Sequence, residues 1–133
     1  RRSSDLREGL KESFSRAVEA IVNSTGPVVL TGIGKSGLVA AKIASTLTST
    51  GTPSVYIHAA EALHGDIGVV TPSSVVIAVG KSGESDELKA LLPIVKRIGT
   101  TIIAITANES SSMASLADIV LLLDIPQLSQ LII

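Results

Sequence analysis

The sequence contains no cysteine and no tryptophan, and Phe14 and Tyr56 are its only large aromatic side chains. Without cysteine, the chain can form no disulfide, thiolate nucleophile or cysteine-ligated metal site, which fits a reducing compartment and makes the cytoplasm the expected location. The shortage of aromatic residues excludes a base-stacking surface for single-stranded nucleic acid. The hydrophobic core must therefore consist of Val, Ile, Leu and Ala.

Charge and long hydrophobic runs are also scarce. Charged residues make up 17% of the chain and the net charge is -1, so we expect no nucleic-acid partner. The longest apolar runs, such as residues 119–123, are too short to cross a bilayer, and polar residues follow the N-terminal arginines where a signal peptide would have an apolar core. We therefore expect a soluble protein that is neither secreted nor membrane-bound.

Hydrophobic periodicity divides the 133 residues into alternating helices and strands. Apolar, β-branched runs predict five strands, and spacings of three or four residues predict helices between them. This alternation is typical of a parallel sheet covered on both faces. The expected strands are residues 28–31, 54–57, 75–79, 101–106 and 119–123, and the expected helices are 3–23, 38–50, 84–98 and short pieces within 59–68 and 112–117.

We expect a single domain, with an N-terminal helix in residues 1–24 and an α/β core in residues 25–125. Residues 127–133 resemble the first turns of a further helix that stops abruptly. Either a loop is missing near Pro126, or the chain is part of a longer protein.

A glycine-rich turn, residues 32–37, follows the first predicted strand and precedes a helix, where backbone N–H groups favour an anion. A nucleoside-triphosphate P-loop would need glycine at position 29, which is valine. The glycine spacing fits a dinucleotide site, but the second strand ends at His58 where an acid should bind the ribose. A tight turn alone would explain the glycines and leave Lys35 unexplained. The remaining alternative is a small phosphorylated ligand that contacts Lys35 and Ser36.

A second loop of the same kind, residues 80–87, follows the third predicted strand. Its hydroxyls, Ser82 and Ser85, and the N–H groups at the next helix start can surround a phosphate dianion. In the simpler alternative, Ser82 or Ser85 only caps the helix and Glu87 completes a capping box. Because both loops follow parallel strands, we expect them to form one site.

These two loops together resemble the SIS (sugar isomerase) family. The motifs are Gly-Ile-Gly-Lys-Ser-Gly at 32–37 and Lys-Ser-Gly-Glu-Ser at 81–85. Residues 49–54, 61–68 and 111–114 are similar to the arabinose-5-phosphate isomerase branch of that family. The resemblance runs from about Val28 to Leu123 and implies a three-layer, flavodoxin-like α/β sandwich with a five-stranded parallel sheet.

The resemblance also implies an aldose–ketose isomerase that converts ribulose 5-phosphate to arabinose 5-phosphate for 3-deoxy-octulosonate and lipopolysaccharide synthesis. Lys35, Glu87 and His64 are its candidate catalytic residues. No cofactor would be required, but His64 is a candidate for an inhibitory zinc ion, and a homotetramer is implied. The phosphate would be bound by Gly34, Ser36, Ser82, Gly83, Glu84 and Ser85.

The sequence departs from the branch at two points. The branch usually has Ser-Asn where this chain has Gly80 and Lys81, so one hydroxyl is replaced by a positive charge. The branch also continues past the fifth strand with a catalytic glutamate and a later histidine, often followed by CBS modules, none of which occurs in this sequence. Two alternatives therefore stay open: a non-catalytic sugar-phosphate sensor, and an isomerase for another ketose phosphate.

Overall fold

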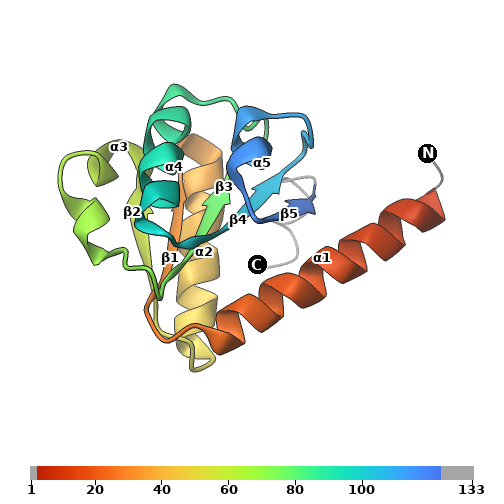
Figure 1. Cartoon of the computed structure of the whole chain (residues 1–133), viewed down its shortest axis with the longest axis horizontal. Coiled ribbons are helices and arrows are strands. Elements are labelled where there is room, and N and C mark those ends of the chain that lie inside the picture. Colours follow the sequence, from red (N-terminus) through yellow and green to blue (C-terminus); the bar gives the residue numbers. More distant parts are fainter. Residues whose placement is uncertain (1–2, 124–133) are drawn as a thin grey trace.

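The computed structural model describes residues 3–123, with side chains from Gly9 onward, and a parallel sheet of five strands lies at its centre (Figure 1). The strand order is β2-β1-β3-β4-β5. This order is that of a flavodoxin-like sheet, as the family resemblance implied. The strands are β1 (Val28–Gly32), β2 (Ser54–His58), β3 (Val75–Val79), β4 (Thr101–Thr106) and β5 (Ile119–Leu122).

Helices cover both faces of the sheet and complete the predicted three layers. One hydrophobic cluster joins α1 and α2 to one face, and a second joins α3, α4 and α5 to the other. The central strands β1 and β3 are buried throughout, which explains their uninterrupted apolar sequence. The helices are α1 (Ser3–Asn23), α2 (Gly34–Ser49), α3 (Ala59–Ala62), the 3-10 turn η1 (Asp66–Val69), α4 (Asp86–Ile98) and α5 (Ser112–Leu116).

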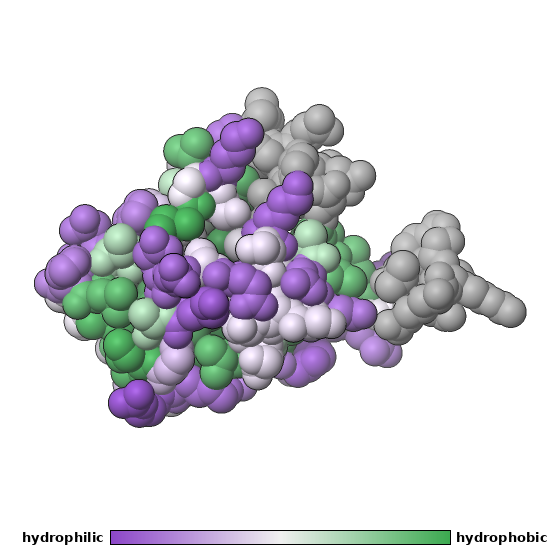
Figure 2. Space-filling view, turned by 90° about the horizontal axis from the view of Figure 1, so that it is seen from above, coloured by the Kyte–Doolittle hydropathy of each residue, from purple (hydrophilic) through white to green (hydrophobic). Residues whose placement is uncertain are grey.

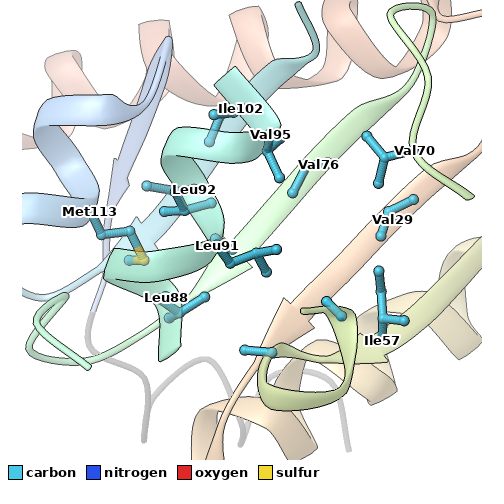
Figure 3. Close-up of a cluster of buried hydrophobic side chains, with 14 residues drawn as sticks. Val29, Ile57, Val70, Val76, Leu88, Leu91, Leu92, Val95, Ile102 and Met113 are labelled. Carbon is cyan, nitrogen blue, oxygen red and sulfur yellow. The ribbon is translucent and has the colours of Figure 1, made fainter. Parts of the chain in front are cut away.

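Helix α4 forms because its sequence provides a capping residue at each end and an apolar face that packs against the sheet. Ser85 is the N-cap and accepts a hydrogen bond from Leu88 N–H, and Gly99 ends the helix in a left-handed conformation. The buried leucines and Val95 recur on one side and pack against strands β3 and β4 (Figure 3). The predicted start at Glu84 was wrong by two residues, because Ser85 is the cap. Glu87 is then the second helical residue, so the predicted capping box does not form.

Helix α2 begins at Gly34, four residues before the predicted start at Leu38. Its first turn therefore contains most of the glycine-rich turn. A side chain on Gly32 would lie 3.0 Å from the backbone of Ser36 and Gly37, and one on Gly37 would lie 2.7 Å from the Tyr56 hydroxyl. These glycines let the first turn of α2 lie directly against the ends of β1 and β2.

Helix α1 runs past β5, and its N-terminal part projects beyond the rest of the molecule (Figure 1). Leu10, Ala17, Ala20 and Ile21 pack toward the sheet. A second stripe of Phe14, Val18 and Val22 stays exposed, with exposed fractions of 58%, 43% and 74%. In Figure 2, which looks onto the molecule from above, hydrophobic residues form separate patches among hydrophilic ones.

Across residues 3–123, no helix combines the length and hydrophobicity needed to cross a membrane. The helix predicted at 127–133 lies outside the described residues.

Candidate sugar-phosphate site

The two glycine-rich loops meet at one edge of the sheet because β1 and β3 are adjacent and parallel. Gly32 at the end of β1 pairs in register with Val79 at the end of β3. Helix α2 then leaves toward one face and α4 toward the other, which opens a crevice between the loops. Open α/β sheets bind ligands at such a switch in chain direction.

A cavity of about 450 Å³ lies at this edge, a size typical of small-molecule sites. Both loops contribute to it, together with the segment that follows β4. Its lining residues are Ile33, Ser36, Val79, Gly80, Lys81, Ser82, Gly83, Ser85, Leu88, Ala107 and Asn108.

The loop after β3 is held by hydrogen bonds from the segment between β4 and α5. The carbonyl of Lys81 accepts from the Ala107 N–H at 3.1 Å and from the Thr106 hydroxyl at 3.1 Å. The carbonyl of Ser82 accepts from the Asn108 side-chain amide at 3.2 Å, and that of Gly83 from Met113 N–H at 3.1 Å. The carbonyls of three successive residues, 81–83, are therefore all hydrogen-bonded to this segment.

The N–H groups of the same three residues, 81–83, donate to no other residue in the described part of the chain. Consecutive free N–H groups form an anion-binding nest. The N–H groups of residues 34–36 in the first turn of α2 likewise have no acceptor among residues 3–123, and the N-cap Ile33 offers no side-chain oxygen. The two loops thus present backbone donors suited to a phosphate.

Hydroxyls add to these donors. Ser82 Oγ accepts from Glu84 N–H at 3.2 Å and Ser85 Oγ from Leu88 N–H at 3.3 Å, which leaves each hydroxyl hydrogen free to donate. Ser36 also lines the cavity. Capping and phosphate binding are therefore compatible roles for Ser85.

Gly83 cannot be replaced without distortion. Its φ is +72°, and a side chain there would collide with the Ser111 side chain. Because Ser111 is the N-cap of α5 and accepts from Ala114 N–H at 3.1 Å, it cannot move aside freely.

Glu84 is turned toward α5. Its carboxylate accepts hydrogen bonds from the hydroxyl of Ser112 at 2.6 Å and from the N–H of Ser112 at 3.0 Å. The Ser112 hydroxyl, then the Ser112 N–H, and to a lesser degree Lys89 lower the pKa of Glu84, so it is ionised at neutral pH. Glu84 was expected to help bind the phosphate, but it does not line the cavity, and its carboxylate binds the first turn of α5 instead.

Four other predicted residues do not line the cavity: Gly34, Lys35, His64 and Glu87. Lys35 is exposed in the first turn of α2, and Glu87 is half-buried in the first turn of α4. His64 is exposed in the turn after α3. Within the described part of the chain, no three His, Asp or Glu side chains lie close enough together to hold a metal ion.

The sequence profile of the SIS domain matches residues 21–130, most of the chain and both loops of the cavity. The chain belongs to the SIS domain family.

Related SIS proteins connect this domain with one class of enzyme. The chain is 46% identical over 122 residues to the arabinose 5-phosphate isomerase KdsD of Yersinia pestis. The matched region covers 92% of this chain and 37% of that protein. It is 51% identical over 108 residues to the arabinose 5-phosphate isomerase KpsF of an Escherichia coli O6:H1 strain, covering 81% of this chain and 33% of that protein. The chain thus spans about a third of the length of these relatives.

A solved structure from E. coli CFT073 in complex with arabinose 5-phosphate has the same fold. The two structures superpose with a TM-score of 0.79 at 34% sequence identity. The superposed region covers 91% of this chain and 74% of that one.

Two lining residues of this SIS domain, Lys81 and Asn108, were not among the predicted site residues. Asn108 comes two residues after β4 ends, at the same sheet edge as both loops. The rule that carboxyl ends of parallel strands share an edge could have identified it. In the sequence, Lys81 opens the second-loop motif and departs from the branch, and neither feature indicates that it lines the cavity.

Proposed function

We propose that this chain is the catalytic SIS domain of an aldose–ketose isomerase that interconverts ribulose 5-phosphate and arabinose 5-phosphate. The observation that carries the proposal is its 46–51% identity to proteins named arabinose 5-phosphate isomerase. The cavity supports it, because its lining of free N–H groups and hydroxyls suits a phosphate ester.

The phosphate would lie between the two loops. Ser36, Ser82 and Ser85 would donate hydroxyl hydrogens, and the backbone at Gly34 and Gly83 would donate N–H groups. Glu84 would act indirectly, by holding the loop after β3 against α5. The sugar would then extend from the cavity toward Lys35 and Glu87, which lie in the first turns of the two flanking helices.

The reaction moves a proton between neighbouring carbons. A base removes a proton from C1 of ribulose 5-phosphate, an enediol forms, and a proton is delivered to C2 as the hydroxyl proton shifts from O1 to the C2 oxygen. We assign Lys35 to stabilising the negative charge that develops on oxygen, and Glu87 to acid–base or positioning work. His64 would assist ring opening or bind a hydroxyl. These steps require no redox cofactor.

In the cell, arabinose 5-phosphate would supply 3-deoxy-octulosonate synthesis for lipopolysaccharide, and the protein would act in the cytoplasm as a homotetramer. The exposed stripe on α1 supports oligomerisation, because three large apolar side chains lie on one face of that helix.

The experiment that tests this function is an NMR assay of the protein at its full native length, with ribulose 5-phosphate in deuterated water and a chelator present. We expect arabinose 5-phosphate with deuterium at C2. Lys35→Ala and Glu87→Gln should lower kcat by about 100-fold or more, the usual range for acid–base groups. Asp86→Asn is the matched control, since Asp86 is the exposed neighbour of Glu87.

Phosphate-ester binding without turnover would contradict the isomerase proposal and support a sensor domain. Turnover of a different ketose phosphate, with none of ribulose 5-phosphate, would keep the reaction class and contradict the substrate.

A further inference from the structure

Among the described residues, Lys81 is the one charged side chain that lines the cavity. All other lining residues are apolar, hydroxyl, amide or glycine. A phosphate dianion in this cavity would otherwise meet only neutral donors. We propose that Lys81 supplies the cation that binds the ligand's phosphate, an inference that rests on the proposed sugar-phosphate function and specifies which lysine serves it.

The ammonium group of Lys81 has no carboxylate partner within residues 9–123. The two acids that follow it first in the chain are engaged elsewhere. Glu84 binds Ser112 and lies 4.0 Å from Lys89, and Asp86 lies 3.9 Å from Lys89. The carboxylates of Glu84 and Asp86 are thus directed toward α5 and Lys89, and no carboxylate of the described residues forms an ion pair with Lys81.

The backbone of Lys81 is held in place. Its carbonyl accepts two hydrogen bonds at 3.1 Å, from Ala107 N–H and from the Thr106 hydroxyl, both at the end of β4. The side chain therefore extends from a fixed backbone position that lines the cavity, next to the free N–H groups of residues 81–83. Because the backbone is already fixed, the conformational entropy that phosphate binding costs at this residue is that of the side chain alone.

This placement separates two lysines by function. Lys35, in the first turn of α2, does not line the cavity and is assigned to the reacting end of the sugar. Lys81 contacts the non-reacting phosphate, so its charge contributes equally to binding of substrate and transition state. Losing it should raise KM more than it lowers kcat. Because the site opens to solvent, the interaction should also weaken with salt.

The test compares Lys81→Met, Lys81→Arg and Lys42→Met in the protein at its full native length. Lys42 is an exposed lysine of α2 outside the cavity, so its replacement removes the same charge elsewhere. Inorganic phosphate is titrated by calorimetry in low and high salt, and KM and kcat are measured with ribulose 5-phosphate. Thermal unfolding of each variant verifies that it is folded.

We expect Lys81→Met to weaken phosphate binding and raise KM by about tenfold, the scale of one charge-assisted hydrogen bond. Most of the salt dependence of phosphate binding should be lost in the same variant. Lys81→Arg should retain the phosphate affinity and its salt dependence, and Lys42→Met should behave as wild type. Equal phosphate affinity and salt dependence in Lys81→Met and wild type, or a loss in kcat with KM unchanged, overturns the inference.

Failure of this inference is distinct from failure of the proposed function. Normal turnover in Lys81→Met with unchanged phosphate affinity overturns the role of Lys81 and leaves the isomerase in place. Weakened phosphate binding in the variant of a protein that turns over no ribulose 5-phosphate supports Lys81 and contradicts ribulose 5-phosphate as the substrate.

Discussion

The carboxylate of Glu84 accepts both the N–H and the hydroxyl of Ser112, at 3.0 Å and 2.6 Å, across 28 residues of sequence. This pair joins the loop after β3 to the first turn of α5. Together with the bond from Met113 N–H to the Gly83 carbonyl, it determines which way the loop presents its N–H groups. The loop's shape therefore depends on α5 as much as on its own sequence.

Breaking this link should weaken phosphate binding in a graded way. Ser112→Ala removes the hydroxyl donor and keeps the N–H, so we expect a loss of about threefold, whereas Glu84→Ala removes both bonds and should cost about tenfold. Calorimetric titration with inorganic phosphate measures both. Glu109→Ala is the control, an exposed acid of the same segment with no hydrogen bond or ion pair to another described residue. Equal affinities in all three variants would contradict the role of the link.

The pKa of Glu84 predicts a pH dependence of stability. Hydrogen bonds from Ser112 lower this pKa below its ordinary value, about 4.3 in the unfolded chain. The folded state thus favours the carboxylate, and its contribution is complete above about pH 4.3 and is lost as the pH falls through the folded-state pKa. Urea unfolding should show wild type more stable than Glu84→Gln at pH 7, with the difference shrinking at pH 4 and below. A difference independent of pH would contradict this linkage.

Gly83→Ala should both destabilise the protein and reduce phosphate affinity, because the added side chain meets Ser111 and the backbone has a positive φ. We expect a loss of about 2–4 kcal/mol in the free energy of unfolding, combining strain and collision. Gly99→Ala is a matched control: its φ is also positive, at +93°, but a side chain there meets nothing within 4 Å. That variant should lose about 1 kcal/mol and bind phosphate normally.

If the exposed stripe of α1 is an interface between copies, charge placed there should dissociate the assembly. Val18→Glu puts a carboxylate in the centre of the stripe formed with Phe14 and Val22. Sedimentation velocity should show wild type as a tetramer and the variant as a smaller species.

Asn23→Glu adds the same charge at an exposed position on another side of the helix and should leave the assembly intact. A monomeric wild type, or identical assembly states for both variants, would contradict the interface.

The strands and the main helices could be predicted from the sequence, since their signals are local. Runs such as Val75–Val79 are apolar because both faces of a central strand are buried, and the leucines of α4 recur with the helical period. Helix starts were less predictable. Leu38 was expected to open a helix that Gly34 begins, because glycines near a helix start suggest a turn until the contact with β1 and Tyr56 is known.

The sequence by itself determined the class of fold, the two glycine-rich loops and the serines that line the cavity, because hydrophobic period and glycine position are properties of neighbouring residues. Only the tertiary structure decided that Glu84 binds Ser112, that Asn108 holds Ser82, and that Lys81 is the charge inside the cavity. Each of these relationships joins segments brought together by strand order. No local pattern encodes which distant donor will be adjacent once the sheet has formed.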